Sequence, residues 1–476
     1  MSKSYRPYNP CQEYLLPPSM SDWLDEGHLA YFVSDTIDAM DLREIEEVYE
    51  KEERGYPPYH PRMLTKVLVY AYCTGVFSSR KIARKLEDDV AFRILGAQNR
   101  PDFRTISDFR KRHLKALSGT FKKVLLLCKR AGMVRLGHVA LDGTKQKANA
   151  SKHKAMSYGR MKDESARLEL EIAELLGLAD QTDEAEDSKF GRDVRGDELP
   201  KELAFREGRL ARIKQAMAEL EAEAKEAAEA AEATNKEESG NSPKKDRPKR
   251  RVQWRKKPSG VPDDKAQKNF TDGESKIMVS GDKSFIQAYN AQAAVDSEYQ
   301  VVVAAMVTNR AADAVHVQAM VDKIEENAGQ LPDEMSLDAG YYSEANVEYL
   351  EDKKIDAYMP PRRIKRSEYR VAKPDVVTNK SSIGDRMKAK VLSEQGRKKY
   401  GLRKTTVEPV FGQIKSCMGF RQFSMRGQEA CDAEWSFVCA AHNLLKLFRY
   451  GAAALSKKAQ ECTLTAHTTD ILAVAA

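Results

Sequence analysis

The spacing of apolar residues along the chain predicts helices near the N-terminus and buried strands in the middle. In the first region apolar residues recur every three or four positions, which is the spacing of one helix face. Helices are expected at 29–40, 61–75, 78–86 and from Thr105 onward. From residue 138 short apolar runs replace this period, as in buried strands. The expected strands are 139–142, 284–295, 298–308, 334–338 and 355–360.

Helices return between and after the later strands. The stretches 311–325 and 343–354 are amphipathic, and a further helix carries its apolar stripe on Val407, Val410, Phe411 and Ile414. A last helix is expected at 430–450. The order of three strands followed by alternating helices and strands describes a mixed α/β core behind a helical N-terminal region. The expected fold class is therefore α+β with more than one domain.

A long polar segment, 155–263, interrupts this core after its first strand. Apolar residues there repeat every seven positions and predict a helical hairpin: Leu203, Leu210 and Met217, together with Ile213 and Leu220. The basic run 243–258 follows, with nine Lys or Arg residues against one Asp. Such a run, with Trp254 embedded in it, suits contact with DNA phosphates and stacking on a base. The alternative is a charged linker.

Length and composition narrow the classes of protein to which the chain can belong. A chain of 476 residues is too long for one ordinary core, so two or three domains are expected. Lys and Arg exceed Asp and Glu by only 79 to 72, so binding to nucleic acid depends on local basic clusters. The seven cysteines form no CxxC pair, which argues against a zinc site or a disulfide framework. No apolar run approaches the length of a membrane span, so a cytoplasmic protein with no membrane partner is expected.

Three acidic residues stand out by their positions. Asp142 and Asp338 each follow an apolar strand and precede a glycine-containing turn, and Glu408 lies beside the apolar stripe of its helix. Carboxylates at the ends of core strands can converge at one edge of a sheet. Such groups hold Mg²⁺, and two ions about 4 Å apart stabilise the attacking and leaving oxygens of a phosphoryl transfer. Glu408 taken alone also fits an ordinary solvated helix face.

The ordered set of Asp142, Asp338 and Glu408 resembles the DDE triad of bacterial insertion-sequence transposases, which have an RNase H-like core. The resemblance covers roughly residues 55–155 and 268–450. Each Asp alone is a weak signal, whereas the three residues in this order are specific.

The segment around Glu408 also resembles the Tyr-Arg-Glu-Lys signature of that family, Y-x2-R-x3-E-x6-K. Lys415 has the family spacing from Glu408. Tyr400 and Arg403 lie one residue too far upstream, so that Lys404 occupies the slot of the family's Arg. The resemblance implies DNA-binding roles for Tyr400, Arg403, Lys404 and Lys415.

Thr405 and Thr406 bear on which cation contacts DNA, because threonine is a poor residue inside a helix and a good cap. The pair predicts a loop before the helix, in which one extra residue is absorbed. In that case Arg403 binds a backbone phosphate bidentately, and Lys415 makes a second contact. The alternative assigns the phosphate to Lys404.

The N-terminal helices resemble the N-terminal domain of the same transposases. Short helices with tight turns and basic outer faces suit a helix-turn-helix unit that binds DNA, and the alternative is a small bundle with ordinary charged surfaces. Thr105 is expected to open its helix through a capping box with Asp108. The candidate DNA-binding residues, all expected to face outward, are Arg80, Lys81, Arg84, Arg110, Lys111 and Arg112.

The resemblance implies a transposase, an enzyme of metal-dependent phosphoryl transfer on DNA. Its three carboxylates are expected to hold two Mg²⁺ ions, with Mn²⁺ as a substitute. Metal-activated water then cleaves the element ends, and the freed 3′-OH is joined to target DNA. The expected partners are double-stranded DNA, as inverted-repeat ends and target, and further copies of the chain in a homodimer or larger assembly. The expected location is the bacterial cytoplasm, in association with the nucleoid.

Two other functions fit the same residues: a metal-dependent DNA nuclease on an RNase H-like fold that does not join strands, and a DNA-binding regulator whose catalytic site has decayed. Each of these functions is compatible with the same division of the chain into domains. The expected parts are an N-terminal helical DNA-binding domain at 1–135, an RNase H-like core at 136–154 and 264–450, an inserted hairpin with its basic linker at 155–263, and a tail at 451–476.

Overall fold

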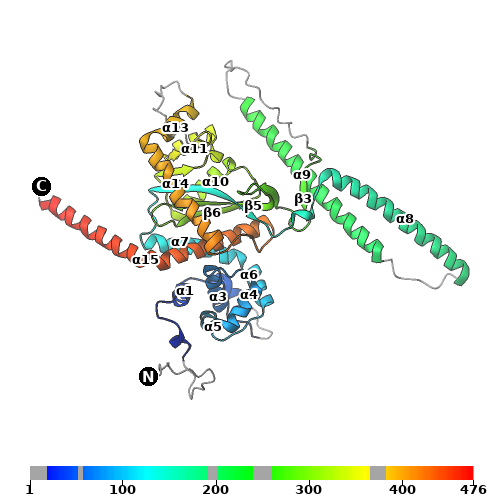
Figure 1. Cartoon of the computed structure of the whole chain (residues 1–476), viewed down its shortest axis with the longest axis horizontal. Coiled ribbons are helices and arrows are strands. Elements are labelled where there is room, and N and C mark those ends of the chain that lie inside the picture. Colours follow the sequence, from blue (N-terminus) through cyan, green and yellow to red (C-terminus); the bar gives the residue numbers. More distant parts are fainter. Residues whose placement is uncertain (1–18, 52–56, 191–200, 240–259, 365–381, 475–476) are drawn as a thin grey trace, which may run out of the picture. The chain divides into compact units, whose positions relative to one another are not determined.

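The computed structural model describes residues 19–51, 57–190, 201–239, 260–364 and 382–474 (Figure 1). The chain forms two compact units. The first comprises Met1–Gln146, Asn290–Met425 and Glu429–Ala476, and the second comprises Lys147–Tyr289 and Arg426–Gln428. Within the described ranges no helix is long and apolar enough to cross a membrane. The cysteines whose side chains are described are free thiols.

The N-terminal part of the first unit is helical. Its helices are α1 (Leu29–Asp38), α2 (Arg43–Glu50), α3 (Pro61–Cys73), α4 (Ser79–Asp88), α5 (Val90–Leu95), α6 (Phe103–Arg112) and α7 (Leu114–Arg130), preceded by the 3-10 turn η1 (Met20–Trp23). α3 begins with Pro61, at a position where the missing N–H costs no helical hydrogen bond. α6 begins two residues before Thr105, because the Asp102 carboxylate accepts a capping bond from the Arg104 N–H at 2.7 Å. The capping box expected at Thr105 is therefore wrong.

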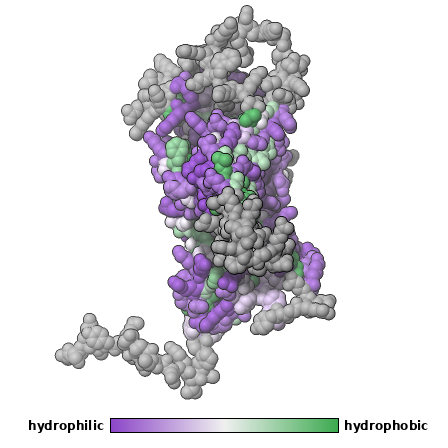
Figure 2. Space-filling view, turned by 90° about the vertical axis from the view of Figure 1, so that its right-hand side faces the viewer, coloured by the Kyte–Doolittle hydropathy of each residue, from purple (hydrophilic) through white to green (hydrophobic). Residues whose placement is uncertain are grey.

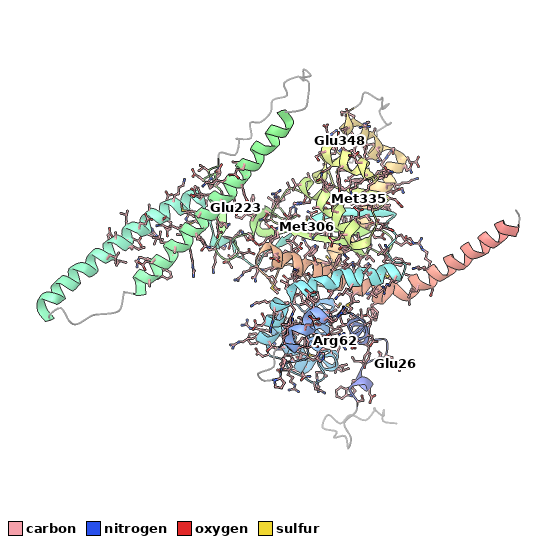
Figure 3. The ribbon with its side chains drawn as sticks, turned by 180° about the vertical axis from the view of Figure 1, so that it is seen from behind. Glu26, Arg62, Glu223, Met306, Met335 and Glu348 are labelled. Atoms are coloured by element: carbon pink, nitrogen blue, oxygen red, sulfur yellow. The ribbon has the colours of Figure 1, made fainter. Side chains whose placement is uncertain are left out.

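A mixed sheet forms the centre of the protein. Its strands are β1 (His138–Lys147), β4 (Lys276–Val279), β5 (Phe285–Asp296), β6 (Val302–Thr308), β7 (Glu334–Leu337) and β8 (Asp356–Tyr358). They are ordered β4-β5-β1-β7-β8, with β6 also paired to β5. β5 runs antiparallel to β4 and β6, whereas β7 runs parallel to β1 and β8. Met335 of β7, labelled in Figure 3, pairs with Val139 and is fully buried.

The predicted strands and the helices between them occur in the predicted order, but the sheet also contains β4, which was not predicted, and one strand boundary is wrong. β1 does not end at Asp142 and continues to Lys147, where it remains a strand of the sheet next to β5. Asp142 consequently projects from within a strand, which fixes its backbone on both sides.

Helices accompany the later strands and follow them. They are α10 (Val317–Ala328), α11 (Glu344–Asp352), α13 (Ile383–Leu392), α14 (Glu394–Gly412) and α15 (Gln428–Val474), with the short turns η3 (Ala314–His316), η4 (Ala339–Tyr341) and η5 (Gln413–Cys417). α10 packs on β6 through apolar residues at helical spacing: Val317, Met320, Val321 and Ile324. α15 extends to Val474, well past its expected end at Tyr450.

α14 corrects the expectation of a loop before Glu408. The Ser393 side chain caps this helix by accepting from Gly396 N at 3.0 Å, so the helix starts well upstream of the two threonines. The Thr405 hydroxyl donates a hydrogen bond to the Leu402 carbonyl at 3.0 Å, and Thr406 is buried. Burial and a stronger cap upstream thus override the low helix propensity of threonine.

The second unit contains the helices of the inserted segment. α8 (Tyr158–Phe190) and α9 (Lys201–Ser239) pack through buried Tyr158, Met161, Leu168, Ile213, Ala216 and Leu220. Ion pairs flank this seam, including Arg209 with Glu164 at 2.7 Å. The short strands β2 (Ala155–Ser157) and β3 (Gln267–Asn269) pair beside the 3-10 turn η2 (Lys152–Lys154). Glu223 of α9, labelled in Figure 3, accepts from Lys268 at 2.9 Å and from Lys276 at 2.7 Å.

A buried carboxylate, Glu434 of α15, links distant parts of the first unit. It accepts hydrogen bonds from Tyr72 of α3 at 3.2 Å, from the backbone N–H groups of Ser424 and Met425 at 2.9 and 3.1 Å, and from the Ser424 hydroxyl. Tyr72 also lies 3.4 Å from the guanidinium of Arg110, which donates to the Phe77 carbonyl at 2.8 Å. One charged group therefore satisfies donors from α3 and from the segment before α15.

This network corrects the expected exposure of Arg110. Its side chain is buried, whereas Lys111 and Arg112 are exposed. Arg110 lies four residues after Ile106 in α6, so it falls on the same helix face as that buried residue.

Replacement of Glu434 by Ala is expected to lower the free energy of unfolding by about 3 kcal/mol, because several buried donors lose a charged acceptor at once. Denaturant unfolding of the full chain measures this loss. Glu429→Ala serves as the control, since Glu429 is an exposed residue in the first turn of the same helix. Equal stability of the two variants would contradict the role given to Glu434.

Candidate active site

Two of the three acidic residues lie at adjacent positions of the sheet. In the parallel pair β1–β7, Leu141 aligns with Leu337, so that the next residue of each chain segment is an Asp. Asp142 accepts from Gly143 N at 2.8 Å, and Asp338 accepts from Ala339 N at 2.6 Å. These local bonds orient each carboxylate on its own backbone.

The third acidic residue, Glu408, is connected to Asp142 by the guanidinium of Arg403. Arg403 of α14 donates to Asp142 Oδ2 at 2.6 Å, and its other terminal nitrogen lies 3.3 Å from Glu408 Oε1. α14 is held on β7 by Lys399, which bonds to Glu334 at 2.7 Å. The structure thus links Asp142 and Glu408 through Arg403.

Burial affects the pKa values of Asp142 and Arg403. The Asp142 side chain is 18% exposed and that of Arg403 12%, whereas Glu408 is 50% exposed. Burial raises the pKa of Asp142 to about 6, although the Arg403 guanidinium opposes this rise. Burial, the largest single influence, would lower the pKa of Arg403, but the charges of Asp142, Tyr400, Asp338 and Glu408 together outweigh it, and the pKa is raised. Arg403 therefore remains a cation at any physiological pH.

A polar network on the adjoining strands was not anticipated from the sequence. Asp313 Oδ1 accepts from Asn290 at 2.7 Å, from Gln292 at 3.0 Å and from Lys145 at 3.2 Å. Gln292 also accepts from the hydroxyl of Tyr341, three residues after Asp338. Asn290 and Gln292 are fully buried polar residues that interrupt the apolar run of β5, and that interruption was the available signal.

This network packs against the residue that follows Asp142. A Cβ atom on Gly143 would overlap the side-chain amide of Gln292 and lie 2.9 Å from Asn290 Oδ1. Glycine is thus required by the close approach of β5 to β1. The network thereby fixes the backbone on which Asp142 is carried.

The other residues of the family signature lie around the same helix. The Arg403 guanidinium carbon is 5.9 Å from the centre of the Tyr400 ring. Lys404 is exposed. Lys415 lies in η5, a π-helical turn, and donates to the hydroxyl of Thr144 on β1. Burial, and next the charge of Arg421, lower the pKa of Lys415.

The candidate DNA-binding residues of the N-terminal helices, apart from Arg110, lie on the surface. Exposed positions are Arg80, Lys81 and Arg84 on α4, and Lys111 and Arg112 on α6. Arg80 stacks on Phe103 at 4.9 Å, which joins the basic faces of the two helices, and Arg112 stacks on Tyr49 at 5.4 Å. Hydrophilic side chains also predominate on the face seen in Figure 2. Trp254 lies outside the described residues.

The donor set suits a hard divalent cation, since all three acidic residues offer carboxylate oxygens. Over the ranges that the structure describes, however, no three His, Cys, Asp or Glu residues are grouped closely enough to hold an ion. Arg403 instead occupies a position in contact with two of the carboxylates. The residue types therefore fit a metal, while their present arrangement is that of an ion-paired cluster.

Comparison with protein families identifies the class. Residues 18–112 match a model described as Transposase domain (DUF772), and residues 249–444 match one described as Transposase DDE domain. Asp338 and Glu408 lie within the second match, and Asp142 lies between the two. Neither the search of curated proteins nor that of solved structures found a match. The two matched segments together span more than half of the chain, and the chain belongs to the transposases with a DDE domain.

Membership of this family carries general properties. The DDE domain implies an RNase H-like core, to which the mixed sheet with β1 in its interior corresponds. The family also implies an enzyme that processes DNA with a divalent metal cofactor.

Replacement of Gly143 by Ala is expected to lower the free energy of unfolding by about 1–3 kcal/mol, because the added methyl group overpacks the contact with Gln292. The measurement is thermal or denaturant unfolding of the full chain. Gly137→Ala provides the control, since Gly137 lies just before β1 and a Cβ there meets no atom within 4 Å. A Gly143→Ala protein as stable as the control would mean that β5 and β1 do not approach this closely.

Proposed function

We propose that this transposase binds the ends of an insertion sequence, cleaves them hydrolytically and joins the resulting 3′-OH to target DNA at the same site. The observation that carries the proposal is the linkage of Asp142 and Glu408 through Arg403, with Asp338 on the adjacent parallel strand. Two of the carboxylates lie where the β1–β7 pairing ends, and Arg403 connects one of them to the carboxylate on α14, which supports a shared site.

Asp142, Asp338 and Glu408 are the residues that would hold the metal, proposed here as two Mg²⁺ ions with Mn²⁺ as a substitute. The ions, when bound, supply Lewis acidity and lower the pKa of coordinated water. The residues of the chain position the carboxylates. Gly143 and Ala339 orient the two aspartates through their N–H groups, and the network around Asp313 holds the strand that carries Asp142.

The cations around α14 are proposed to hold the DNA backbone. Arg403 offers a planar fork of donors that matches phosphate, and Lys415 offers a point charge next to β1. The π-helical turn at η5 adds one residue to that turn of the helix, which directs Lys415 toward Thr144. Tyr400 lies against Arg403, and Lys404 lies on the exposed side of the same helix.

The exposed basic residues of α4 and α6 are proposed to bind the element ends in the manner of a helix-turn-helix unit. Arg110 is excluded from this surface by its burial. Cleavage and joining of paired ends require two active sites, so a homodimer or larger assembly on DNA is part of the proposal.

The variants Asp142→Asn, Asp338→Asn and Glu408→Gln are each expected to reduce strand cleavage to background and to leave binding to element ends intact. Each removes one charged oxygen ligand without changing the size of the side chain. Cleavage of a labelled duplex in Mg²⁺ and gel-shift binding of the same duplex measure the two effects. Glu348→Gln, at an exposed position of α11, is the control.

The outcomes separate the functions that share this fold. Full cleavage by one of the three variants would remove that residue from the site. Cleavage by the unaltered chain without any joined product would indicate a nuclease, and binding without cleavage would indicate a regulator.

Reversal of Lys111 and Arg112 to Glu in the full chain is expected to weaken binding to DNA and to lower its salt dependence. Loss of two phosphate contacts reduces the slope of log K against log salt concentration by about two. Titration of a fluorescent duplex at several salt concentrations gives this slope. The same reversal at Lys353 and Lys354, after α11, is the control for net charge. Equal slopes for the two variants would place α6 away from DNA.

A further inference from the structure

The side chain of Arg403 is only 12% exposed and lies between two carboxylates that the proposed function assigns to a metal. Its terminal nitrogens lie 2.6 Å from Asp142 and 3.3 Å from Glu408. Its third nitrogen, Nε, is buried and has no hydrogen-bond partner. The guanidinium thus neutralises the carboxylates while one of its own donors stays unsatisfied.

A divalent ion and this guanidinium cannot both occupy the site as it stands. The guanidinium lies between Asp142 Oδ2 and Glu408 Oε1, in the space that an ion bound to both carboxylates would take. An ion bound to Asp142 and Glu408 would also lie within a few ångströms of a positive charge, and the low exposure of Asp142 and Arg403 leaves their repulsion only partly screened. Metal binding therefore requires Arg403 to leave.

The backbone of α14 is not free to move it away. Val407 and Val410 are fully buried, and Lys399 holds the helix on β7 through Glu334. The movement is thus confined to the side chain of Arg403. A DNA phosphate is a suitable acceptor, because guanidinium binds phosphate through two parallel hydrogen bonds and can satisfy donors that are unused here.

We propose that Arg403 is the resident cation of the carboxylate site, and that it exchanges for the divalent metal when a DNA phosphate takes its guanidinium. In the protein without DNA, Arg403 holds Asp142 and Glu408 and excludes the metal. On DNA the carboxylates are released. The inference rests on the proposed function and adds to it a mechanism by which metal loading depends on substrate. By thermodynamic linkage, metal must then tighten DNA binding by the factor by which DNA tightens metal binding.

Binding of Mn²⁺ to the full chain tests this exchange without any turnover. Free Mn²⁺ is measured by electron paramagnetic resonance, with and without a duplex of fixed length, after correction for the ions that the duplex binds alone. The unaltered chain is expected to bind Mn²⁺ weakly and to gain affinity by about tenfold or more when DNA is added.

The variant Arg403→Gln is expected to bind Mn²⁺ about tenfold or more tightly without DNA, and to gain little further when DNA is added. Lys398→Gln is the matched control, because it removes the same charge from an exposed residue of α14, one that pairs with Glu394 in the first turn of that helix. It should behave as the unaltered chain. Arg403→Lys keeps the charge and is expected to lie much closer to the unaltered chain than Arg403→Gln does.

The outcomes distinguish this inference from the proposed function. If Asp142→Asn and Asp338→Asn leave Mn²⁺ binding unchanged, the metal is held elsewhere and the proposed function fails. If those variants abolish binding but Arg403→Gln binds no better than Lys398→Gln, only the exchange is wrong. Should Arg403→Gln not fold, an unaltered chain whose Mn²⁺ affinity is the same with and without DNA overturns the exchange by itself.

Discussion

Parallel pairing of β1 with β7 is the constraint on which the site depends. The register that aligns Leu141 with Leu337 also brings the following residues, Asp142 and Asp338, to the point where the β1–β7 pairing ends. Two negative charges so placed need compensation in a buried position, and α14 supplies it through Arg403. The position of α14 on β7 is in turn set by Lys399 and Glu334. The geometry of the charged residues is thus a consequence of strand register and of how one helix is attached to it.

The support for Asp142 is organised differently from that for Asp338. Asp142 lies inside a long strand, with Gly143 pressed against the amide groups of β5. Asp338 instead caps a short 3-10 turn after β7, and its carboxylate accepts from the N–H of the next residue, Ala339. The first carboxylate is therefore held by tertiary packing and the second by local backbone. Sequence changes in β5 should for this reason affect Asp142 more than Asp338.

Much of the core could be predicted from the sequence, because buried strands and amphipathic helices leave clear patterns. The strands from β5 to β8 and the two helices between them follow their apolar residues closely. Predictions based on local propensity were less accurate. Thr405 and Thr406 indicated a loop, but the cap at Ser393 and the burial of Thr406 produce a continuous helix. Three consecutive basic residues in α6 appeared equivalent, although helical spacing from Ile106 already places Arg110 on the buried face. Asp313 had no local signal, because its partners lie on strands that only the folded sheet brings near.

The carboxylate of Glu434 has a consequence for how such a chain can evolve. Tyr72 and Arg110 of the N-terminal helices complete a hydrogen-bond network that includes Glu434 of α15. These helices therefore cannot be exchanged as a unit between unrelated cores. A recombinant that joined them to a core lacking this acceptor would bury polar groups without partners. Residues at 72, 110 and 434 are therefore expected to vary together among relatives. The proposed DNA-binding surface is then expected to change by substitution on the exposed faces of α4 and α6 rather than by replacement of the whole segment.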